Sequence, residues 1–271
     1  MLKQRIMTAL WLVPLALIGF FALQGPAFFT FIAVIIGLAG WEWARLAGYS
    51  KPMQRVAYAV LIVLLLGLLS RFEAILLPLL YLAGAWWLFA TAMVVSFPRC
   101  ITLWGGRLGK CLMGFLILIP AGLGLLLLKA LPQGNLLILT IMLLVWSADI
   151  GAYFFGRALG KRKLAPKVSP GKSWAGLFGG LLTSLCVALG LVLYLKVSLA
   201  QLPMLLLGAA VVVLFSVVGD LTESMFKRQM AIKDSSQLLP GHGGILDRID
   251  SLTAAVPVFA LLLLLTGWAL P

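Results

Sequence analysis

A chain of 271 residues in which 63% are hydrophobic and only 11% are charged cannot be a water-soluble domain, because continuous apolar stretches of about 20 residues form membrane-spanning helices. The sequence therefore predicts an all-α, polytopic integral membrane protein. Its formal net charge of +13 is explained by basic loops that orient the chain and contact anionic membrane lipids, so we expect no nucleic-acid partner.

About nine apolar runs are long enough to cross a bilayer. They lie at residues 6–23, 26–44, 56–70, 74–97, 111–131, 135–156, 174–196, 202–221 and 251–270. The first run is longer than the apolar core of a signal peptide, and no A-x-A-like cleavage site precedes the second, so we expect it to remain as a spanning helix. We divide the chain into about five N-terminal spans, residues 1–131, and about four catalytic spans, residues 132–271.

The lysines and arginines lie mainly on one side of the membrane. If the N-terminus is cytoplasmic, all of the chain's 21 lysines and arginines except Arg71, Lys129 and Lys196 fall on the cytoplasmic side. This is the positive-inside pattern. It places two long polar segments, residues 157–173 and 222–250, at the cytoplasmic face. We therefore expect a multi-pass protein of the inner (cytoplasmic) membrane whose site faces the cytoplasm.

The N-terminal spans carry few residues that indicate chemistry. Glu42 and Arg45 stand three residues apart near the end of the second span, and this spacing predicts a local ion pair on one face of a helix. The tryptophans of this half are typical of membrane-interface anchors or of helix packing. We expect the chemistry to lie in the second half of the chain.

The sixth span becomes polar near its predicted cytoplasmic end, where Asp149 lies. An acid at this depth indicates either an interhelical ion pair or one wall of a site, and we favour the site. Arg157, Lys167, Ser169 and Lys172 follow before the next helix begins. Free backbone N–H groups and the helix dipole attract phosphate at such a helix start. We expect these residues to bind the substrate.

Gly171, Lys172 and Ser173 spell the end of a P-loop. That motif also requires an earlier glycine, and it lies between a strand and a helix. Pro166 occupies the position of the earlier glycine, and we expect no strand before it. We therefore reject a P-loop nucleotide triphosphatase, although the basic segment still suits a triphosphate bound by another geometry.

The densest group of charges lies between Gly219 and Asp250. Of the 8 acidic residues in the chain it holds Asp220, Glu223, Asp234, Asp247 and Asp250, together with Lys227, Arg228, Lys233, Arg248 and the only histidine, His242. Charges of both signs between apolar spans predict a functional site. Asp220 and Glu223 stand three residues apart, as do Asp247 and Asp250, so on helices each pair shares a face. Two acidic faces suit a divalent metal, and the basic residues suit phosphate.

The order of residues in this stretch resembles the signature of the phosphatidate cytidylyltransferase family, also called CDP-diacylglycerol synthases. The matching residues are Ser224, Lys227, Arg228, Lys233, Asp234, Pro240, His242, Gly243, Gly244, Asp247, Arg248 and Asp250. Upstream, Asp149, Gly151, Tyr153, Gly156, Arg157, Gly160 and the segment 169–172 also resemble that family, whereas Ser173 and Ala175 depart from its usual residues. The N-terminal half matches only as a generic multi-span pattern.

The resemblance implies a nucleotidyltransferase that condenses CTP with phosphatidic acid to CDP-diacylglycerol and pyrophosphate in phospholipid synthesis. It implies Mg²⁺, leaves open a second cation such as K⁺, and implies a homodimer. A phosphate monoester is largely dianionic at cytosolic pH and attacks phosphorus without a strong general base. This agrees with a sequence that shows no Ser/His/Asp arrangement.

The expected roles follow from the chemistry of each side chain. Asp220, Asp247 and Asp250 are the expected Mg²⁺ ligands, with Glu223 as a weaker ligand, because carboxylates suit this hard cation. Lys227, Lys233, Arg248 and His242 form the expected catalytic group: the basic residues hold phosphates, and His242 acts on a phosphate or closes a tight turn. For Arg228 and Asp234, a solvated salt pair and a role in the site are equally favoured.

Two other hypotheses use the same charges. A transporter for an anionic metabolite would place them at the membrane midplane between inverted repeats, whereas here the acids crowd one cytoplasmic segment. A CDP-alcohol phosphotransferase would carry an Asp-Gly…Ala-Arg pattern, which the sequence lacks.

Overall fold

The computed structural model describes residues 2–99 and 101–267. Its helices are α1 (Leu2–Leu17), α2 (Gly25–Leu46), α3 (Pro52–Leu69), α4 (Glu73–Ser96), α5 (Ile101–Trp104), α6 (Arg107–Ala130), α7 (Gly134–Leu159), α8 (Trp174–Tyr194), α9 (Leu202–Gln229) and α10 (Leu246–Thr266). A π-helical turn, η1 (Ile18–Ala22), continues α1, and a 3₁₀ turn, η2 (Leu199–Gln201), precedes α9. Two short strands, β1 (Lys163–Ala165) and β2 (Ser169–Ser173), form an antiparallel hairpin.

Eight of the described helices are long and apolar enough to cross a membrane, which confirms the prediction of a helical, multi-span protein. They are α2, α3, α4, α6, α7, α8, α9 with η2, and α10. The predicted first span is a shorter apolar helix, Ile6–Ala22, so the count of nine stays a prediction. Helices α2, α3 and α9 each have a proline in the first turn, where its fixed φ favours the start of a helix.

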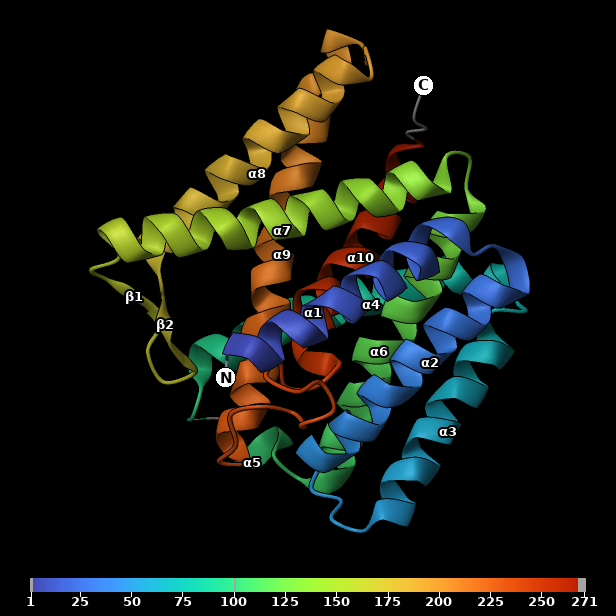
Figure 1. Cartoon of the computed structure of the whole chain (residues 1–271), viewed down its shortest axis with the longest axis vertical. Helices are drawn as coiled ribbons and strands as arrows, with labels where there is room; N and C mark the ends of the chain where they lie inside the picture. Colours follow the sequence, from blue (N-terminus) through green and yellow to red (C-terminus); the bar gives the residue numbers. More distant parts are fainter. Residues whose placement is uncertain (1, 100, 268–271) are drawn as a thin grey trace.

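The connections between the helices fall into two groups at opposite ends of the molecule (Figure 1). The α2–α3 connection, α5, the β1–β2 hairpin and the loop before α10 lie toward the bottom and left of the view. The α3–α4, α6–α7 and α8–α9 connections lie toward the right and top. Connections that alternate between two opposite ends are expected of a chain that crosses a membrane several times. The basic segments that the sequence predicts to be cytoplasmic are all in the first group.

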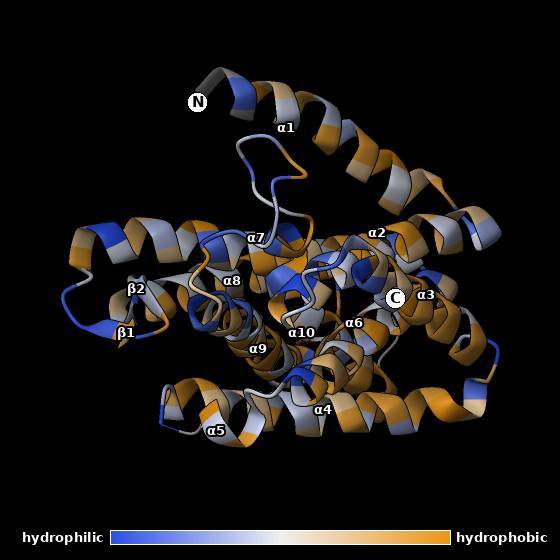
Figure 2. Cartoon of the chain, turned by 90° about the horizontal axis from the view of Figure 1, so that it is seen from below, coloured by the Kyte–Doolittle hydropathy of each residue, from blue (hydrophilic) through white to orange (hydrophobic). Residues whose placement is uncertain are grey.

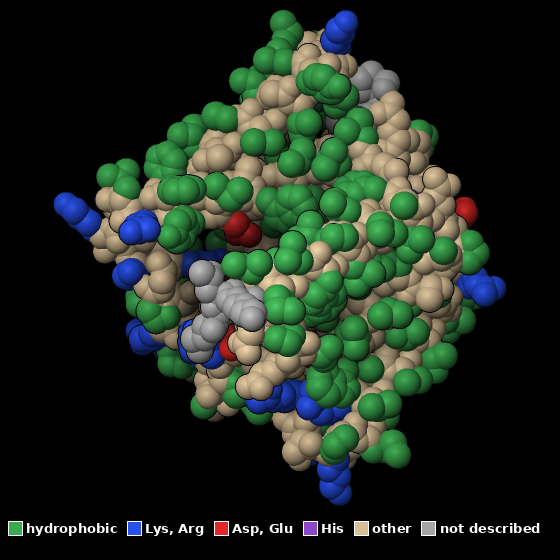
Figure 3. Space-filling view, in the orientation of Figure 1, with side chains coloured by type: hydrophobic (Ala, Val, Ile, Leu, Met, Phe, Trp, Pro, Cys, Tyr) green, Lys and Arg blue, Asp and Glu red, His purple; other side chains and the backbone are tan. Residues whose placement is uncertain are grey.

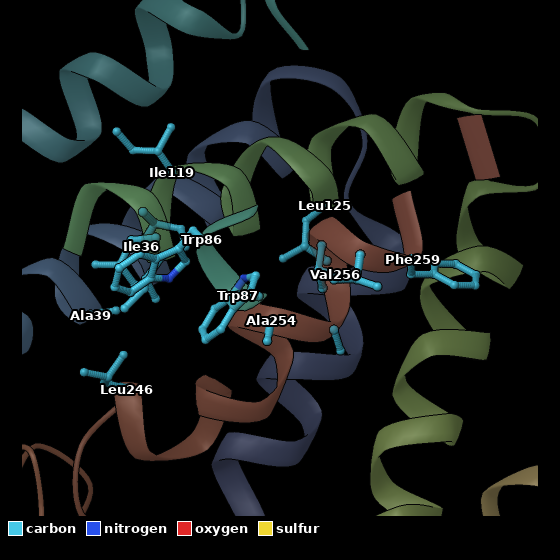
Figure 4. Packing of buried hydrophobic residues seen from close by; sticks show 14 of the residues in the cluster. Ile36, Ala39, Trp86, Trp87, Ile119, Leu125, Leu246, Ala254, Val256 and Phe259 are labelled. Carbon is cyan, nitrogen blue, oxygen red and sulfur yellow. The ribbon is translucent and has the colours of Figure 1, made fainter. Parts of the chain in front are cut away.

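The apolar core lies where α2, α4, α6 and α10 meet. Trp87 of α4 is 1% exposed and Ala254 of α10 is 0% exposed. Figure 4 shows these two side chains near one another, with Leu125 close to Val256. The large exposed residues of α3 and α4 are mostly apolar as well, and Figure 2 shows both ribbons largely in the hydrophobic colour. Because lipid tails are as apolar as these side chains, close packing rather than exclusion of water holds such helices together.

The charged stretch is more helical than the sequence predicts. Helix α9 continues through the charged residues to Gln229, and α10 begins at Leu246. The predicted polar segment 222–250 is therefore a loop only over residues 230–245. The acids of both predicted pairs lie on these two helices, which pack against each other.

The β1–β2 hairpin also differs from the prediction. Lys163 pairs with Ser173, and Ala165 pairs with Ser169. The segment predicted to be an open phosphate-binding loop is thus a strand, and a strand does precede the Gly-Lys-Ser sequence. That sequence lies inside β2 itself, and Ser173 caps α8 by accepting a hydrogen bond from the Gly176 N–H group at 3.1 Å. The arrangement is not that of a P-loop.

Helices α9 and α10 approach closely at Gly219. A Cβ atom at this position would lie 2.5 Å from the backbone oxygen of Asp250 and 3.1 Å from the Cβ atom of Ala254. A backbone oxygen cannot move aside as the end of a flexible side chain can. The absence of a side chain at Gly219 therefore lets the acids of the two helices lie together.

Gly219→Ala is expected to destabilise the protein by about 1–3 kcal/mol, the usual cost of overpacking a close contact. Gly190→Ala in α8 is the matched control, because a Cβ atom there would meet nothing within 4 Å. The control should be neutral or slightly stabilising, since alanine has the higher helix propensity. Thermal unfolding in detergent compares the two variants, and equal melting temperatures would contradict the packing argument.

Candidate functional site

Lys227 of α9 forms an ion pair with Asp247 of α10. Its ammonium nitrogen lies 2.7 Å from Asp247 Oδ1 and 3.3 Å from Glu223 Oε1. The side chains of Asp247 and Glu223 are only 5% and 4% exposed. Removing one partner from a buried ion pair leaves the other charge uncompensated and is strongly destabilising. Lys227 therefore fixes the position of α10 relative to α9.

Asp247 also organises the loop before α10. Its Oδ2 atom accepts hydrogen bonds from the Gly244 N–H group at 2.7 Å, the Ser235 N–H group at 3.0 Å and the Ser235 hydroxyl at 2.9 Å. An acid in the first turn that reaches back to a preceding N–H group works as in a capping box. Both oxygens of Asp247 are therefore engaged within the protein.

A second ion pair lies where β2 meets α9. Lys172 Nζ is 2.7 Å from Asp220 Oδ2, and each side chain is 27% exposed. The Ser224 hydroxyl donates to Asp220 Oδ1 over 3.2 Å. Asp149 of α7 and Lys172 both line a cavity of about 220 Å³ between α7, β2 and α8. Figure 3 shows acidic side chains in a hollow near α7, with lysine or arginine side chains beside them.

Asp250 completes the acidic group. It is close enough to Asp220, Glu223 and Lys172 to interact with each electrostatically, and its Oδ1 atom accepts a hydrogen bond from the Ser251 N–H group at 2.7 Å. Glu223 is buried beneath it, and neither of its carboxylate oxygens accepts a hydrogen bond from the described residues. We call Asp220, Glu223, Asp247 and Asp250, with Lys172 and Lys227, the charged cluster.

The charge balance of the charged cluster fits a divalent cation. Its carboxylates outnumber its ammonium groups, and a buried carboxylate without a counter-charge is costly. Among the described residues, no three Asp, Glu, His or Cys side chains already converge as a metal-binding group. A cation bound here would therefore depend on water and substrate phosphates for most of its ligands, as Mg²⁺ commonly does.

Glu42 of α2 is an anchor for the loop 230–245 that the sequence does not predict. Its side chain is 0% exposed. Oε1 accepts hydrogen bonds from the Ser236 hydroxyl at 2.6 Å and the Ile245 N–H group at 3.0 Å. Oε2 accepts from the Leu246 N–H group at 2.6 Å and, at 3.1 Å, shares the Ser235 hydroxyl proton with Asp247 Oδ2. Glu42 therefore holds both the loop and the first turn of α10.

The predicted ion pair between Glu42 and Arg45 is wrong. Arg45 donates from Nη1 to the backbone oxygen of Ser235 at 3.0 Å, so both residues bind the loop 230–245 instead of each other. Gly244 makes room for this contact, because a Cβ atom there would collide with the Ser235 hydroxyl and with Glu42. In the sequence, the only indication that Glu42 has such a role is its position as an acid inside an apolar span.

His242 closes a turn within the loop. Its N–H group donates to the Leu239 oxygen at 2.8 Å, and the Leu239 N–H group donates to the Gly243 oxygen at 2.8 Å. The imidazole Nδ1 atom is buried and has no hydrogen-bond partner among the described residues. The backbone of His242 thus stabilises the turn, while Nδ1 of its ring makes no hydrogen bond with the described residues.

The other predicted site residues form no ion pair with the charged cluster in the part of the chain that the structure describes. Arg228 Nε donates to the Val168 oxygen at 3.1 Å and does not pair with Asp234, which is exposed. Arg157 Nη1 lies 3.2 Å from the Tyr153 hydroxyl. Lys167, Lys233 and Arg248 are exposed, and Ser169 is half-buried in β2. Lys167, Lys233 and Arg248 add exposed positive charge to the hairpin, the loop 230–245 and the start of α10.

The carboxylates and lysines of the charged cluster thus lie on neighbouring elements of a helical bundle whose described part has eight candidate membrane spans. The chain belongs to the cytidylyltransferase family, whose sequence model matches residues 3–266. It is 58% identical to a phosphatidate cytidylyltransferase of Pseudomonas aeruginosa over 271 residues, 100% of both chains. It is 42% identical to one of Haemophilus influenzae, with 96% of this chain and 98% of the relative covered.

A phosphatidate cytidylyltransferase of Staphylococcus epidermidis is 46% identical over 134 residues, which is 49% of this chain. The Pseudomonas and Haemophilus relatives match through the N-terminal half as well, where the sequence signature was only generic. The N-terminal helices, including Glu42 in α2, therefore belong to the same family domain as the charged cluster.

Glu42→Gln is expected to destabilise the protein, because the amide has one acceptor oxygen where the carboxylate has two. Its NH₂ group would also face the N–H and hydroxyl donors that now bind the second carboxylate oxygen. Each buried donor left without a partner costs about 1–3 kcal/mol. Glu73→Gln is the matched control, since Glu73 is exposed at the start of α4, and it should leave stability unchanged. Melting in detergent and limited proteolysis report on the two variants. A Glu42→Gln protein that melts with the control and resists cleavage within 230–245 would rule out the anchoring role.

Proposed function

We propose that this chain is a phosphatidate cytidylyltransferase, which condenses CTP with phosphatidic acid to give CDP-diacylglycerol and pyrophosphate. The observation that carries the proposal is the charged cluster on α9, α10 and β2, within a chain that is 58% identical throughout to a relative of that name. The acids lie together on the C-terminal helices α9 and α10 rather than in corresponding halves of an inverted repeat, which favours a transferase over a transporter.

In this reaction an oxygen of the lipid phosphate attacks the α-phosphorus of CTP, the bond from that phosphorus to the bridging oxygen breaks, and pyrophosphate leaves. The lipid phosphate is already largely dianionic near neutral pH, so it needs no strong general base. The difficulty is electrostatic, since one polyanion must approach another. Positioning and charge stabilisation account for most of the catalysis in phosphoryl transfer.

The lysines of the charged cluster meet this electrostatic requirement. Lys172 and Lys227 hold their ammonium groups next to carboxylates, at the place where the phosphates of CTP have to lie if the acids hold a metal. Lys233 and Arg248 border the same region and add positive charge. We assign Asp149, which shares a cavity with Lys172, to the wall that contacts the nucleotide.

We also propose that the acids hold Mg²⁺, with Asp220 and Asp250 as the main ligands. These two have fewer partners within the protein than Asp247, whose oxygens also bind the loop 230–245. Glu223 lies behind them as a supporting charge. When bound, the metal offsets negative charge on the attacking and leaving phosphate oxygens.

The remaining parts of the proposal concern the surroundings of the site. We place it at the cytoplasmic face of the inner membrane, because the basic segments gather at the end of the bundle that carries the hairpin (Figure 1). A homodimer and a second cation such as K⁺ stay predictions from the family resemblance.

The direct test incubates the purified protein in detergent with labelled CTP, phosphatidic acid and Mg²⁺. We expect CDP-diacylglycerol and pyrophosphate in equal amounts, no product in EDTA, recovery with Mg²⁺, and poor activity with Ca²⁺, which is larger and has looser geometry. The Pseudomonas relative serves as the positive control. Full turnover in chelator would end the metal proposal, and CTP uptake into vesicles without product would support a transporter.

Asp220→Asn is expected to lower kcat by about 10²–10³, the usual cost of removing one preorganised electrostatic contribution. Its melting temperature should change little, because the Lys172–Asp220 pair is partly exposed and such pairs contribute little to stability. Asp234→Asn is the control from the neighbouring loop, since Asp234 is exposed. Turnover of Asp220→Asn within about threefold of Asp234→Asn would remove Asp220 from the ligand set.

A further inference from the structure

A cavity of about 610 Å³ lies between α1 with η1 on one side and α2, α7 and α10 on the other. This volume is within the range of about 300–1,000 Å³ that small-molecule sites have. Its walls include Leu12 and Ala16 of α1, Ile35 of α2, Met142 of α7 and Leu252 of α10. These side chains offer a ligand no strong hydrogen bonds, so this part of the cavity suits hydrocarbon.

Hydrogen bonds hold α1 at Thr8 and the following turn η1 at Phe20 and Phe21. Thr8, which is 2% exposed, donates from its hydroxyl to the Pro240 oxygen at 2.8 Å. At the far end, Lys129 and Asn135 donate to the backbone oxygens of Phe20 and Phe21 at 2.6 and 3.0 Å. Figure 2 shows α1 set apart from the other helices. These hydrogen bonds tie α1 and η1 to the loop 230–245, to α6 and to α7.

The cavity has a charged end next to the loop 230–245. Arg248 lines it there beside Leu239 and Ile245, and the Arg248 side chain forms no hydrogen bond or ion pair with the described residues. A guanidinium group binds phosphate oxygens in pairs. Arg248 directly follows Asp247 in the first turn of α10, where consecutive side chains point about 100° apart. The cavity and the charged cluster therefore lie on adjacent faces of the same turn.

Two other apolar cavities lack such a group. The space between α2 and α3, about 780 Å³, and the space between α7, α8, α9 and α10, about 260 Å³, are lined by no charged side chain of the described residues. Of these spaces, only the one beneath α1 joins a long apolar wall to a free guanidinium group. Its chemistry matches an amphiphile with a phosphate headgroup.

We propose that the cavity beneath α1 holds an acyl chain of the phosphatidic acid substrate, with Arg248 on the lipid phosphate. The inference rests on the proposed function and adds the position of the lipid. It gives α1 a role as the cover of the lipid site, connected through Thr8 and Pro240 to the loop that carries His242. The phosphate then reaches the charged cluster while its chain stays in an apolar environment.

The first test fills the cavity with Ala16→Phe and measures KM for dioleoyl and dihexanoyl phosphatidic acid. KM for the long-chain lipid should rise about tenfold, as when a pocket rejects a group it cannot hold, while KM for the short-chain lipid and for CTP stays unchanged. Ala59→Phe is the matched control, because Ala59 is half-buried in the α2–α3 cavity. Equal KM values for Ala16→Phe and the control would overturn the inference.

The second test uses the unmodified protein, so it depends neither on turnover nor on the correct folding of a variant. Phosphatidic acid carrying a diazirine near the end of one acyl chain is photolysed on the unmodified protein without CTP, and the adducts are mapped by mass spectrometry. Adducts on the cavity residues of α1, α2 and α10 that excess phosphatidic acid displaces would support the inference. Displaceable adducts confined to the α2–α3 or α7–α10 cavities would overturn it. A protein that binds no phosphatidic acid at all would instead contradict the proposed function.

Discussion

The ion pairs of the Lys227 ammonium group are the contacts on which the arrangement of the site depends. Lys227 lies against Asp247 of α10 and Glu223 of its own helix, away from solvent. Charges in such a position attract strongly, yet removing either partner leaves a buried, uncompensated charge that destabilises the fold. Because Gly219 lets the two helices approach, this contact sets how α9 and α10 lie and places Asp220 and Asp250 side by side.

The N-terminal helices contribute to the site through hydrogen bonds rather than through reacting groups. Glu42 and Arg45 of α2 hold the loop 230–245, and Thr8 of α1 binds the same loop at Pro240. The loop is therefore fixed from two sides by helices far away in the sequence. A chain shortened to its C-terminal half would keep the acids of α9 and α10 but lose the contacts that hold the loop between them.

The sequence predicted the spans and the charged stretch because apolar runs and charge density are local properties. Helices α2 to α4 and α6 to α10 overlap the predicted runs closely. The pairing across elements could not be predicted, since spacing along one helix does not tell which helices are neighbours. Glu42 is the clearest case: the three-residue spacing pointed to Arg45, whereas its partners Ser235 and Ser236 lie about 190 residues away. The hairpin was missed because proline and glycine in β2 favour a loop.

The central claim is that the charged cluster is one metal-dependent CTP site. Electron paramagnetic resonance with Mn²⁺ in place of Mg²⁺ tests it most directly, because the metal signal reports binding without turnover. The account predicts one class of bound Mn²⁺ that requires CTP, is retained in Asp234→Asn, and is lost when Asp220 and Asp250 are both changed to Asn. Undiminished CTP-dependent Mn²⁺ binding in the folded double variant would contradict it.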